Sequence, residues 1–103
     1  MDKIAGLKEI LALDPANSLA RYGIAMELAS RGEIDAALSE FDTLLSGDPG
    51  YIAGYFMSAQ TLVKVGRTQE AVERLKTGVR RAEQVGNSHA VSEMQGLLED
   101  LTR

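Results

Sequence analysis

The side chains that carry acid-base or ligand chemistry do not form the pattern that a catalytic or metal site requires. His89 is the sole histidine of a chain without cysteine, and alone it does not found a zinc site. Carboxylates such as Glu33/Asp35 and Glu99/Asp100 are adjacent or turn residues on polar stretches. No Ser-His-acid set and no glycine-rich phosphate loop is present. We therefore expect no enzymatic activity, no catalytic residues, no metal and no cofactor.

The composition is that of an ordinary globular domain. The chain has 103 residues, of which 45% are hydrophobic and 25% charged. This length provides one continuous core and is too short for two domains. The absence of cysteine excludes disulfides, thiolate metal sites and cysteine nucleophiles. Because no basic stretch precedes an apolar run and no uncharged stretch reaches membrane-spanning length, we expect a cytoplasmic protein without a membrane partner.

Charge is unevenly distributed along the chain. The segment 27–48 is mainly acidic, whereas residues 62–82 carry only Glu70 and Glu73 against a cluster of cations: Lys64, Arg67, Arg74, Lys76, Arg80 and Arg81. The isoelectric point of 4.9 and the lack of interleaved aromatic residues argue against a nucleic-acid partner. A solvated helix face, with favourable helix-dipole contacts from Arg80 and Arg81, is the expected role.

An internal repeat dominates the organisation of the chain. Asp14-Pro15 recurs as Asp48-Pro49, 34 residues later, which is the period of a helix-turn-helix repeat. The same spacing relates further residues, namely Ala25/Ala59, Leu28/Leu62, Gly32/Gly66, Ala37/Ala71 and Thr43/Thr77, with Tyr22/Phe56, Phe41/Leu75 and Leu45/Val79 as conservative pairs. The repeat predicts stacked copies of one helical hairpin.

Hydrophobic spacing and turn residues predict six helices and no strand, and hence an all-α fold. Asp-Pro and Gly should end the helices, and Asn17 or Ser18, and later Ser88, should cap them. The expected helices cover residues 2–13, 18 to before Gly32, about 34–46, 52–65 and 68–84, and from 88 onward. In the first helix, Ile4, Leu7, Ile10 and Leu11 lie at helical spacing, with Leu7 and Leu11 as the stripe. The expected buried faces of later helices are Ile24, Ala25 and Leu28; Ala37, Leu38, Phe41, Leu44 and Leu45; Ala71, Val72, Leu75 and Val79; and Val91, Met94, Leu98 and Leu101.

These residues resemble the pattern of the tetratricopeptide repeat family. The matches are Ile24, Ala25, Leu28, Ala37, Phe41 and Pro49 in one repeat and Tyr55, Ala59, Leu62, Ala71, Leu75 and Gly78 in the next. The resemblance implies one domain, 1–103, with a half repeat (1–16), two repeats (18–51 and 52–85) and a capping helix (88–103). It implies a short right-handed solenoid of antiparallel helix hairpins. Arg21, Ser58 and Glu83 depart from the residues that the family prefers.

The resemblance also implies a concave binding face. The second expected helix, between residue 18 and Gly32, is apolar on two sides, and its hairpin needs only one of them. The positions that line the concave side in the family are here Leu19, Tyr22, Met26, Ala53, Phe56, Gln60, His89, Ser92 and Gly96, with Val63 beside them. We expect an adaptor that binds an apolar helix or an extended peptide of a protein partner there.

One further observation narrows this expectation, and two alternatives to it remain. The clamp by which many family members hold a chaperone's terminal carboxylate is absent, because its positions hold Leu19, Gly23, Met57, His89 and Ser92 or Glu93. In one alternative, the residues of the concave side pack against one another and against the last helix, in a solenoid too short to open. In another, the apolar outer face of the first helix, with Ile4, Ile10 and Leu13, serves self-assembly into a homodimer.

Overall fold

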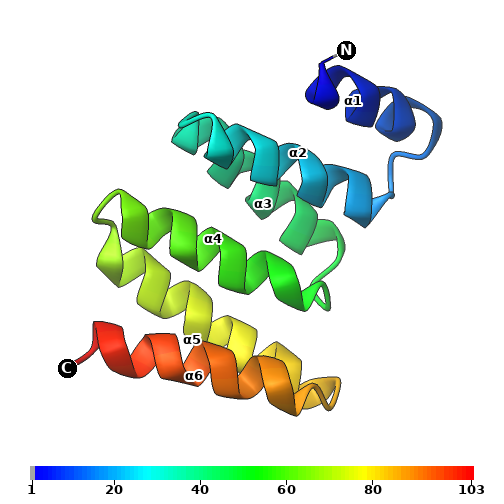
Figure 1. Cartoon of the computed structure of the whole chain (residues 1–103). Coiled ribbons are helices and arrows are strands. Elements are labelled where there is room, and N and C mark those ends of the chain that lie inside the picture. The colour runs from blue at the N-terminus through cyan, green and yellow to red at the C-terminus, as the bar shows by residue number, and fades with distance from the viewer. Residues whose placement is uncertain (1) are drawn as a thin grey trace. The chain divides into compact units, whose positions relative to one another are not determined.

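The structure, a computed structural model, describes residues 2–103, and this part of the chain contains six α-helices and no strand (Figure 1). The helices divide into a first compact unit that ends at Asp48 and a second unit, Pro49–Arg103. Their bounds are α1 Lys3–Leu13, α2 Ser18–Ser30, α3 Ile34–Gly47, α4 Ile52–Lys64, α5 Thr68–Gln84 and α6 Ser88–Leu101. The all-α prediction is confirmed, and the stated helix ends differ from these by at most one residue.

Side-chain caps begin three of the helices. The carboxylate of Asp2 accepts the Ile4 N–H at 3.2 Å, and the Asn17 amide oxygen accepts the Ala20 N–H at 2.9 Å. The first turn of a helix leaves such donors without a partner, and these oxygens satisfy them. At α6, Asn87 caps the Ala90 N–H at 3.0 Å. The prediction of Ser88 as this cap is therefore wrong by one residue, because Ser88 already has helical backbone geometry.

The repeated glycines end helices α2 and α4 in the same way. Gly32 and Gly66 have φ values of 80° and 77°, as predicted. In each turn the following N–H reaches back to the carbonyl of a leucine, from Glu33 to Leu28 and from Arg67 to Leu62, both at 2.9 Å. Glycine takes this left-handed conformation without a steric penalty, so the helix stops and the next one can pack against it.

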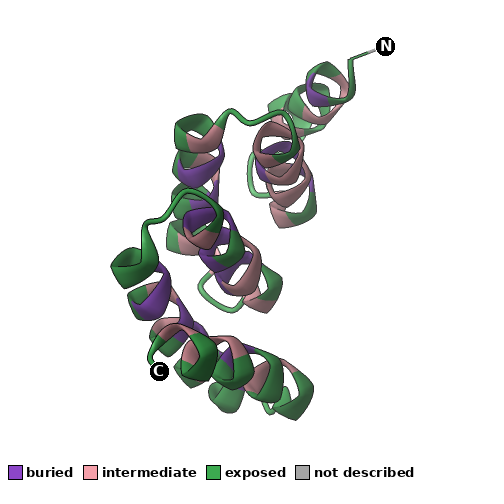
Figure 2. Cartoon of the chain, turned by 60° about the vertical axis from the view of Figure 1, so that its left-hand side comes forward, coloured by how far each residue is buried: buried purple, intermediate pink, exposed green. Residues whose placement is uncertain are grey.

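The first unit has its core between α2 and α3, with α1 packed on α2. Ala25, Ala37 and Phe41 have no exposed surface, and Ile24 and Leu44 are buried with them. Figure 2 shows the buried residues on the sides of the helices that face a neighbour. The small side chains of Ala25 on α2 and Ala37 on α3 allow the two helices to approach each other closely.

The second unit repeats this arrangement with α4 and α5 and adds α6. Ala59, Ala71, Leu75 and Met94 have no exposed surface. Gly78 marks the tightest contact, because a Cβ atom placed there would lie 2.6 Å from the Met94 Sδ and 2.7 Å from the Tyr55 Cβ. Helices α4, α5 and α6 thus meet at a point where even a methyl group is too large.

Several predicted core residues lie nearer the surface than expected. The residues that the hydrophobic pattern assigned to the core include eight that are only half-buried: Leu7, Leu11, Leu28, Leu45, Val79, Val91, Leu98 and Leu101. Ile10, which the sequence placed on the outer face of the first helix, is exposed as expected. A helix that packs against one neighbour buries only a narrow stripe, so residues at the margin of the stripe remain partly in water.

A network of surface ion pairs joins the start of α1 to the end of α2. Arg31 donates to Asp2 at 2.7 Å and to Glu27 at 3.2 Å, and Lys3 lies 3.7 Å from Glu27. The hydrogen bond from Arg31, followed by that from the Ile4 N–H, holds the pKa of Asp2 below its ordinary value. The same bond raises the pKa of Arg31. Asp2 thus caps α1 and links it to α2.

The contact at Gly78 leads to a stability prediction with an internal control. Gly78→Ala should lower the free energy of unfolding by about 1–3 kcal/mol, because the new methyl group overpacks the contact with Tyr55 and Met94. Gly96→Ala should raise it by about 1 kcal/mol, because a Cβ at that exposed helical position meets nothing within 4 Å. Urea unfolding measures both, and equal effects of the two substitutions would contradict the packing described.

The Asp2 network leads to a prediction of pH dependence. Since the pKa of Asp2 is lowered in the folded state, its contribution is complete above the unfolded value of about 3.9 and is lost as the pH falls through the folded value. Asp2→Asn keeps the cap and removes the charge. The melting temperatures of wild type and variant should therefore differ at neutral pH and converge in strong acid. A difference that stays constant down to that range would show that Asp2 acts only as a cap.

Candidate binding surfaces

The nine residues that the sequence predicts for the concave side are called the row here. Those of the first unit lie on one helix, α2. Leu19 is 70% exposed, and Tyr22 and Met26 are half-buried. The Tyr22 ring makes an edge-to-face contact with the buried ring of Phe41, with centroids 6.3 Å apart and planes at 67°. Such a contact holds the ring in a defined orientation. Tyr22 therefore belongs partly to the core of its hairpin and partly to the surface.

The predicted row of the second unit lies on α4 and α6. On α4, Phe56 is half-buried, Ala53 and Gln60 are exposed, and Val63 beside them is half-buried. Helix α6 contacts α4 and packs mainly on α5. Its row residues, His89, Ser92 and Gly96, are all exposed. Each unit thus carries part of the predicted row, and the union of these parts into one groove stays a prediction.

The residues with acid-base chemistry lie at the surface. The Nε2 atom of His89 is 3.2 Å from the Glu93 carboxylate one helical turn away, and the His89 side chain is largely exposed. Among residues 2–103, no group of three or more potential ligands could hold a metal ion. No helix in the described part of the chain is long and apolar enough to cross a membrane.

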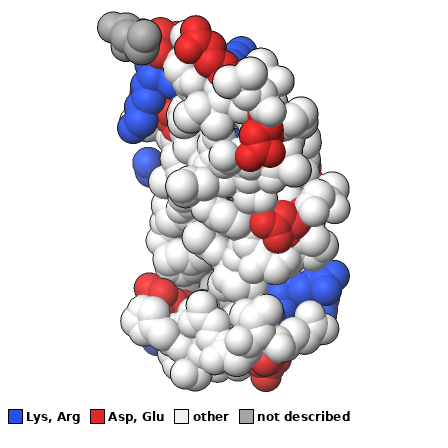
Figure 3. All heavy atoms as spheres, turned by 90° about the vertical axis from the view of Figure 1, so that its right-hand side faces the viewer, with Lys and Arg blue, Asp and Glu red and all other residues white. Residues whose placement is uncertain are grey.

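The basic residues of the second unit form local contacts on exposed helix surface. Arg67 binds the Glu70 carboxylate through two nitrogens at 2.6 and 2.8 Å, and this hydrogen bond lowers the pKa of Glu70. Arg80 donates to the Thr77 hydroxyl and Arg81 to the Gln84 side chain. Figure 3 shows charged side chains of both signs at the surface, among uncharged residues. The solvated-face interpretation agrees with these contacts but not with Arg74, which is half-buried and donates to the buried Ser58 hydroxyl at 3.4 Å.

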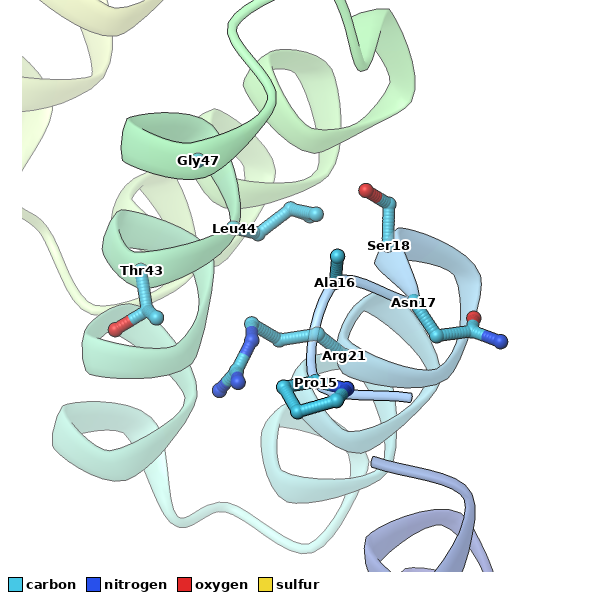
Figure 4. A pocket seen from close by; sticks show the side chains of 8 residues that line it. All are labelled: Pro15, Ala16, Asn17, Ser18, Arg21, Thr43, Leu44 and Gly47. Carbon is cyan, nitrogen blue, oxygen red and sulfur yellow. The ribbon is translucent and has the colours of Figure 1, made fainter. Parts of the chain in front are cut away.

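A pocket in the first unit was not predicted from the sequence. It has a volume of about 200 Å³ and lies between the turn that joins α1 to α2 and the second half of α3. Figure 4 shows the residues around it, which are 15–18, Arg21, Thr43, Leu44 and Gly47. The Arg21 guanidinium donates to Glu40 at 2.9 Å, and the Ser18 hydroxyl donates to Asp48 at 2.7 Å. The one feature of the sequence that could have indicated this pocket is Arg21, which departs from the repeat pattern.

Comparisons with known proteins agree with this architecture. The sequence matches the tetratricopeptide repeat family over residues 28–98. It is 33% identical over 72 residues to a tetratricopeptide repeat and J domain-containing co-chaperone of Cryptococcus neoformans, a match that covers 70% of this chain. The chain spans only 14% of the length of that relative.

Solved structures resemble the chain over most of its length. A protein from Bordetella parapertussis is 27% identical with a TM-score of 0.85, covering 100% of this chain and 90% of that one. The TPR2B domain of yeast Sti1, solved in a complex with pHsp70, is 18% identical with a TM-score of 0.87, covering 96% and 79%, and at this identity it shows the fold alone. With a family match over most of its residues and the repeated hairpins in its structure, the chain belongs to the tetratricopeptide repeat family.

Proposed function

We propose that this domain is a protein-interaction adaptor that binds an apolar peptide or helix of a partner protein along the rows on α2, α4 and α6. Tetratricopeptide repeat domains generally mediate protein–protein interaction, and the chain belongs to that family. None of the nine predicted row residues is buried in the structure. A surface with half-buried aromatic and methionine side chains suits an apolar partner, since these residues bury much area at a low entropic cost.

The observation that carries the proposal is the pair of half-buried side chains Tyr22 and Phe56, which occupy the same position in the two repeats. Each leaves apolar surface in water although its helix already buries another face in its own unit. Residues that bind a partner combine such partial exposure with large apolar area, and aromatic side chains are frequent among those that dominate affinity.

One relative indicates a class of partner. The Cryptococcus neoformans relative, 33% identical over 72 residues, is a co-chaperone. A segment of a chaperone is therefore one candidate partner. The positions of the family's carboxylate clamp hold Leu19, Gly23, Met57, His89 and Ser92 or Glu93 in this chain. We therefore expect recognition of apolar side chains in place of a terminal carboxylate.

A random peptide-display library tests this function. Peptides that bind the protein are selected from it and labelled with fluorescein. Phe56→Ala and Tyr22→Ala should each weaken binding of a selected peptide by about 2 kcal/mol or more. Val85→Ala, which truncates an exposed apolar residue outside the rows, should leave the affinity unchanged. Fluorescence anisotropy measures the three affinities. Equal losses for all three variants would argue against a groove.

Unfolding measurements on the same variants separate a binding residue from a core residue. Leu62→Ala should cost about 2–5 kcal/mol, because Leu62 is buried, and Phe56→Ala should cost less. Tyr22→Ala should cost more than Phe56→Ala, because it also removes the contact with Phe41. If Phe56→Ala destabilises the protein as much as Leu62→Ala does, Phe56 is a core residue and the groove loses its main support.

Self-assembly is a second candidate function, and the exposed side of α1 favours it. Leu13 is 90% exposed and Ile10 is 44% exposed on this helix. Ile4, which the sequence placed on the same outer face, is buried, so that part of the prediction is wrong. Two large aliphatic residues in water are a surface that a second copy of the chain could cover.

This second candidate predicts a concentration-dependent dimer. Light scattering from micromolar to millimolar protein should show dimers for the wild type, because association removes Ile10 and Leu13 from water. The double variant Ile10→Glu/Leu13→Glu should stay monomeric, and Val65→Glu should dimerise as the wild type does, since it places the charge at an exposed residue of the second unit. A monomeric wild type over the whole range would eliminate the self-assembly function.

A further inference from the structure

We infer that the pocket between the α1–α2 turn and α3 binds a tyrosine side chain from a basic segment of a partner protein. The pocket belongs to the first unit, and its lining residues do not include the row residues of the proposed groove. Its volume of about 200 Å³ is below the range of about 300–1,000 Å³ that drug-sized ligands and cofactors occupy. A single side chain is the size of group that it can enclose.

The repeat itself indicates which side chain fits. The 34-residue spacing relates Arg21 to Tyr55 and Pro15 to Pro49. In the second unit, Tyr55 is only 4% exposed and its hydroxyl donates to the Pro49 carbonyl at 2.7 Å. In the first unit, the Arg21 guanidinium donates to Glu40 instead. The first unit therefore has no phenol at this position to donate to the carbonyl of Pro15, and the Arg21 side chain lines the pocket there instead.

A second difference between the repeats lies on the helix that follows, at the position of Gly78. Gly78, which makes room for Tyr55 next to α5, corresponds to Leu44 in the first unit. Leu44 is buried and lines the pocket on the side of α3. The first unit thus has a large aliphatic side chain where the second unit has the space beside Gly78 that Tyr55 uses.

The walls of the pocket suit a phenol. The Pro15 ring, the Ala16 methyl group and the Leu44 side chain offer apolar surface, and the Arg21 side chain crosses between Pro15 and α3 (Figure 4). An aromatic ring can pack on such apolar groups and on the face of a guanidinium. The phenol hydroxyl needs an acceptor when buried, and the Pro15 carbonyl is the counterpart of the one that accepts from Tyr55.

The charges around the pocket favour a basic segment. Residues 2–48 contain nine carboxylate side chains against four Lys and Arg, a net charge of −5, whereas residues 49–103 have a net charge of +1. Three carboxylates belong to residues next to the pocket: Asp14 precedes Pro15, Glu40 accepts from Arg21, and Asp48 accepts from Ser18. Lysine and arginine that flank the tyrosine would meet complementary charge, and acidic flanks would be repelled.

The probe for this site is the peptide acetyl-Lys-Lys-Tyr-Lys-Lys-amide, titrated into the full chain and followed by NMR. The backbone amide signals of Ala16, Ser18 and Leu44 should shift in a saturable way. Replacing the tyrosine of the peptide by alanine, or its lysines by glutamate, should weaken binding at least tenfold. A tyrosine peptide that shifts none of these signals, or an alanine peptide that binds equally well, would overturn the proposal.

Two variants fill the pocket, and a third serves as their control. Ala16→Leu and Gly47→Leu place a side chain at exposed lining positions, and a Cβ at Gly47 meets nothing within 4 Å, so the fold should be kept. Each should weaken the peptide at least tenfold, whereas Ala12→Leu, at an exposed residue of α1, should not. Undiminished binding by both folded variants would contradict the site. Shifts confined to Tyr22, Met26 or Phe56 would place the peptide on the groove rows and overturn the pocket proposal alone.

Discussion

Each hairpin depends on the close approach of its two helices, which only small side chains allow. Ala25 and Ala37 in the first unit and Ala59 and Ala71 in the second have no exposed surface, and the repeat relates the two pairs. Once the helices are this close, large residues can fill the space only at the sides of the contact. The buried stripe on each helix is therefore narrow, and apolar residues beyond it remain at the surface, where they can meet a partner.

The two units place their large side chains differently around this contact between the two helices of a hairpin. In the second unit a tyrosine on α4 faces a glycine on α5, and Met94 of α6 completes the contact. In the first unit the equivalent positions hold Arg21 and Leu44, so the large aliphatic group is on the second helix and the first carries a charge. The Arg21 guanidinium pairs with Glu40, and the pocket lies beside Arg21 and Pro15. Two differing positions thus accompany a packed contact in one unit and a pocket in the other.

The sequence predicted the features that depend on local chemistry. Asp-Pro and glycine end helices because of their own backbone preferences, so the helix bounds followed from Pro15, Gly32, Pro49 and Gly66. The cap of α6 was missed because Asn87 and Ser88 are both competent caps and the pattern does not separate neighbours. The contact at Gly78 and the pocket at Arg21 depend on the side chains of other helices, Met94 and Glu40, whose placement the repeat pattern does not specify.

The link between Tyr22 and Phe41 connects the interior to the proposed function. Binding orders the side chains at an interface, and each mobile side chain that is immobilised costs about 0.5–1.5 kcal/mol. Tyr22 is already oriented by an edge-to-face contact with a ring that has no exposed surface, so less freedom remains to be lost when a partner covers it. Leu19, which is mostly exposed, lacks such support. If the groove binds a peptide, Tyr22 should therefore contribute more affinity per area covered than Leu19, because the core of the hairpin has already fixed its orientation.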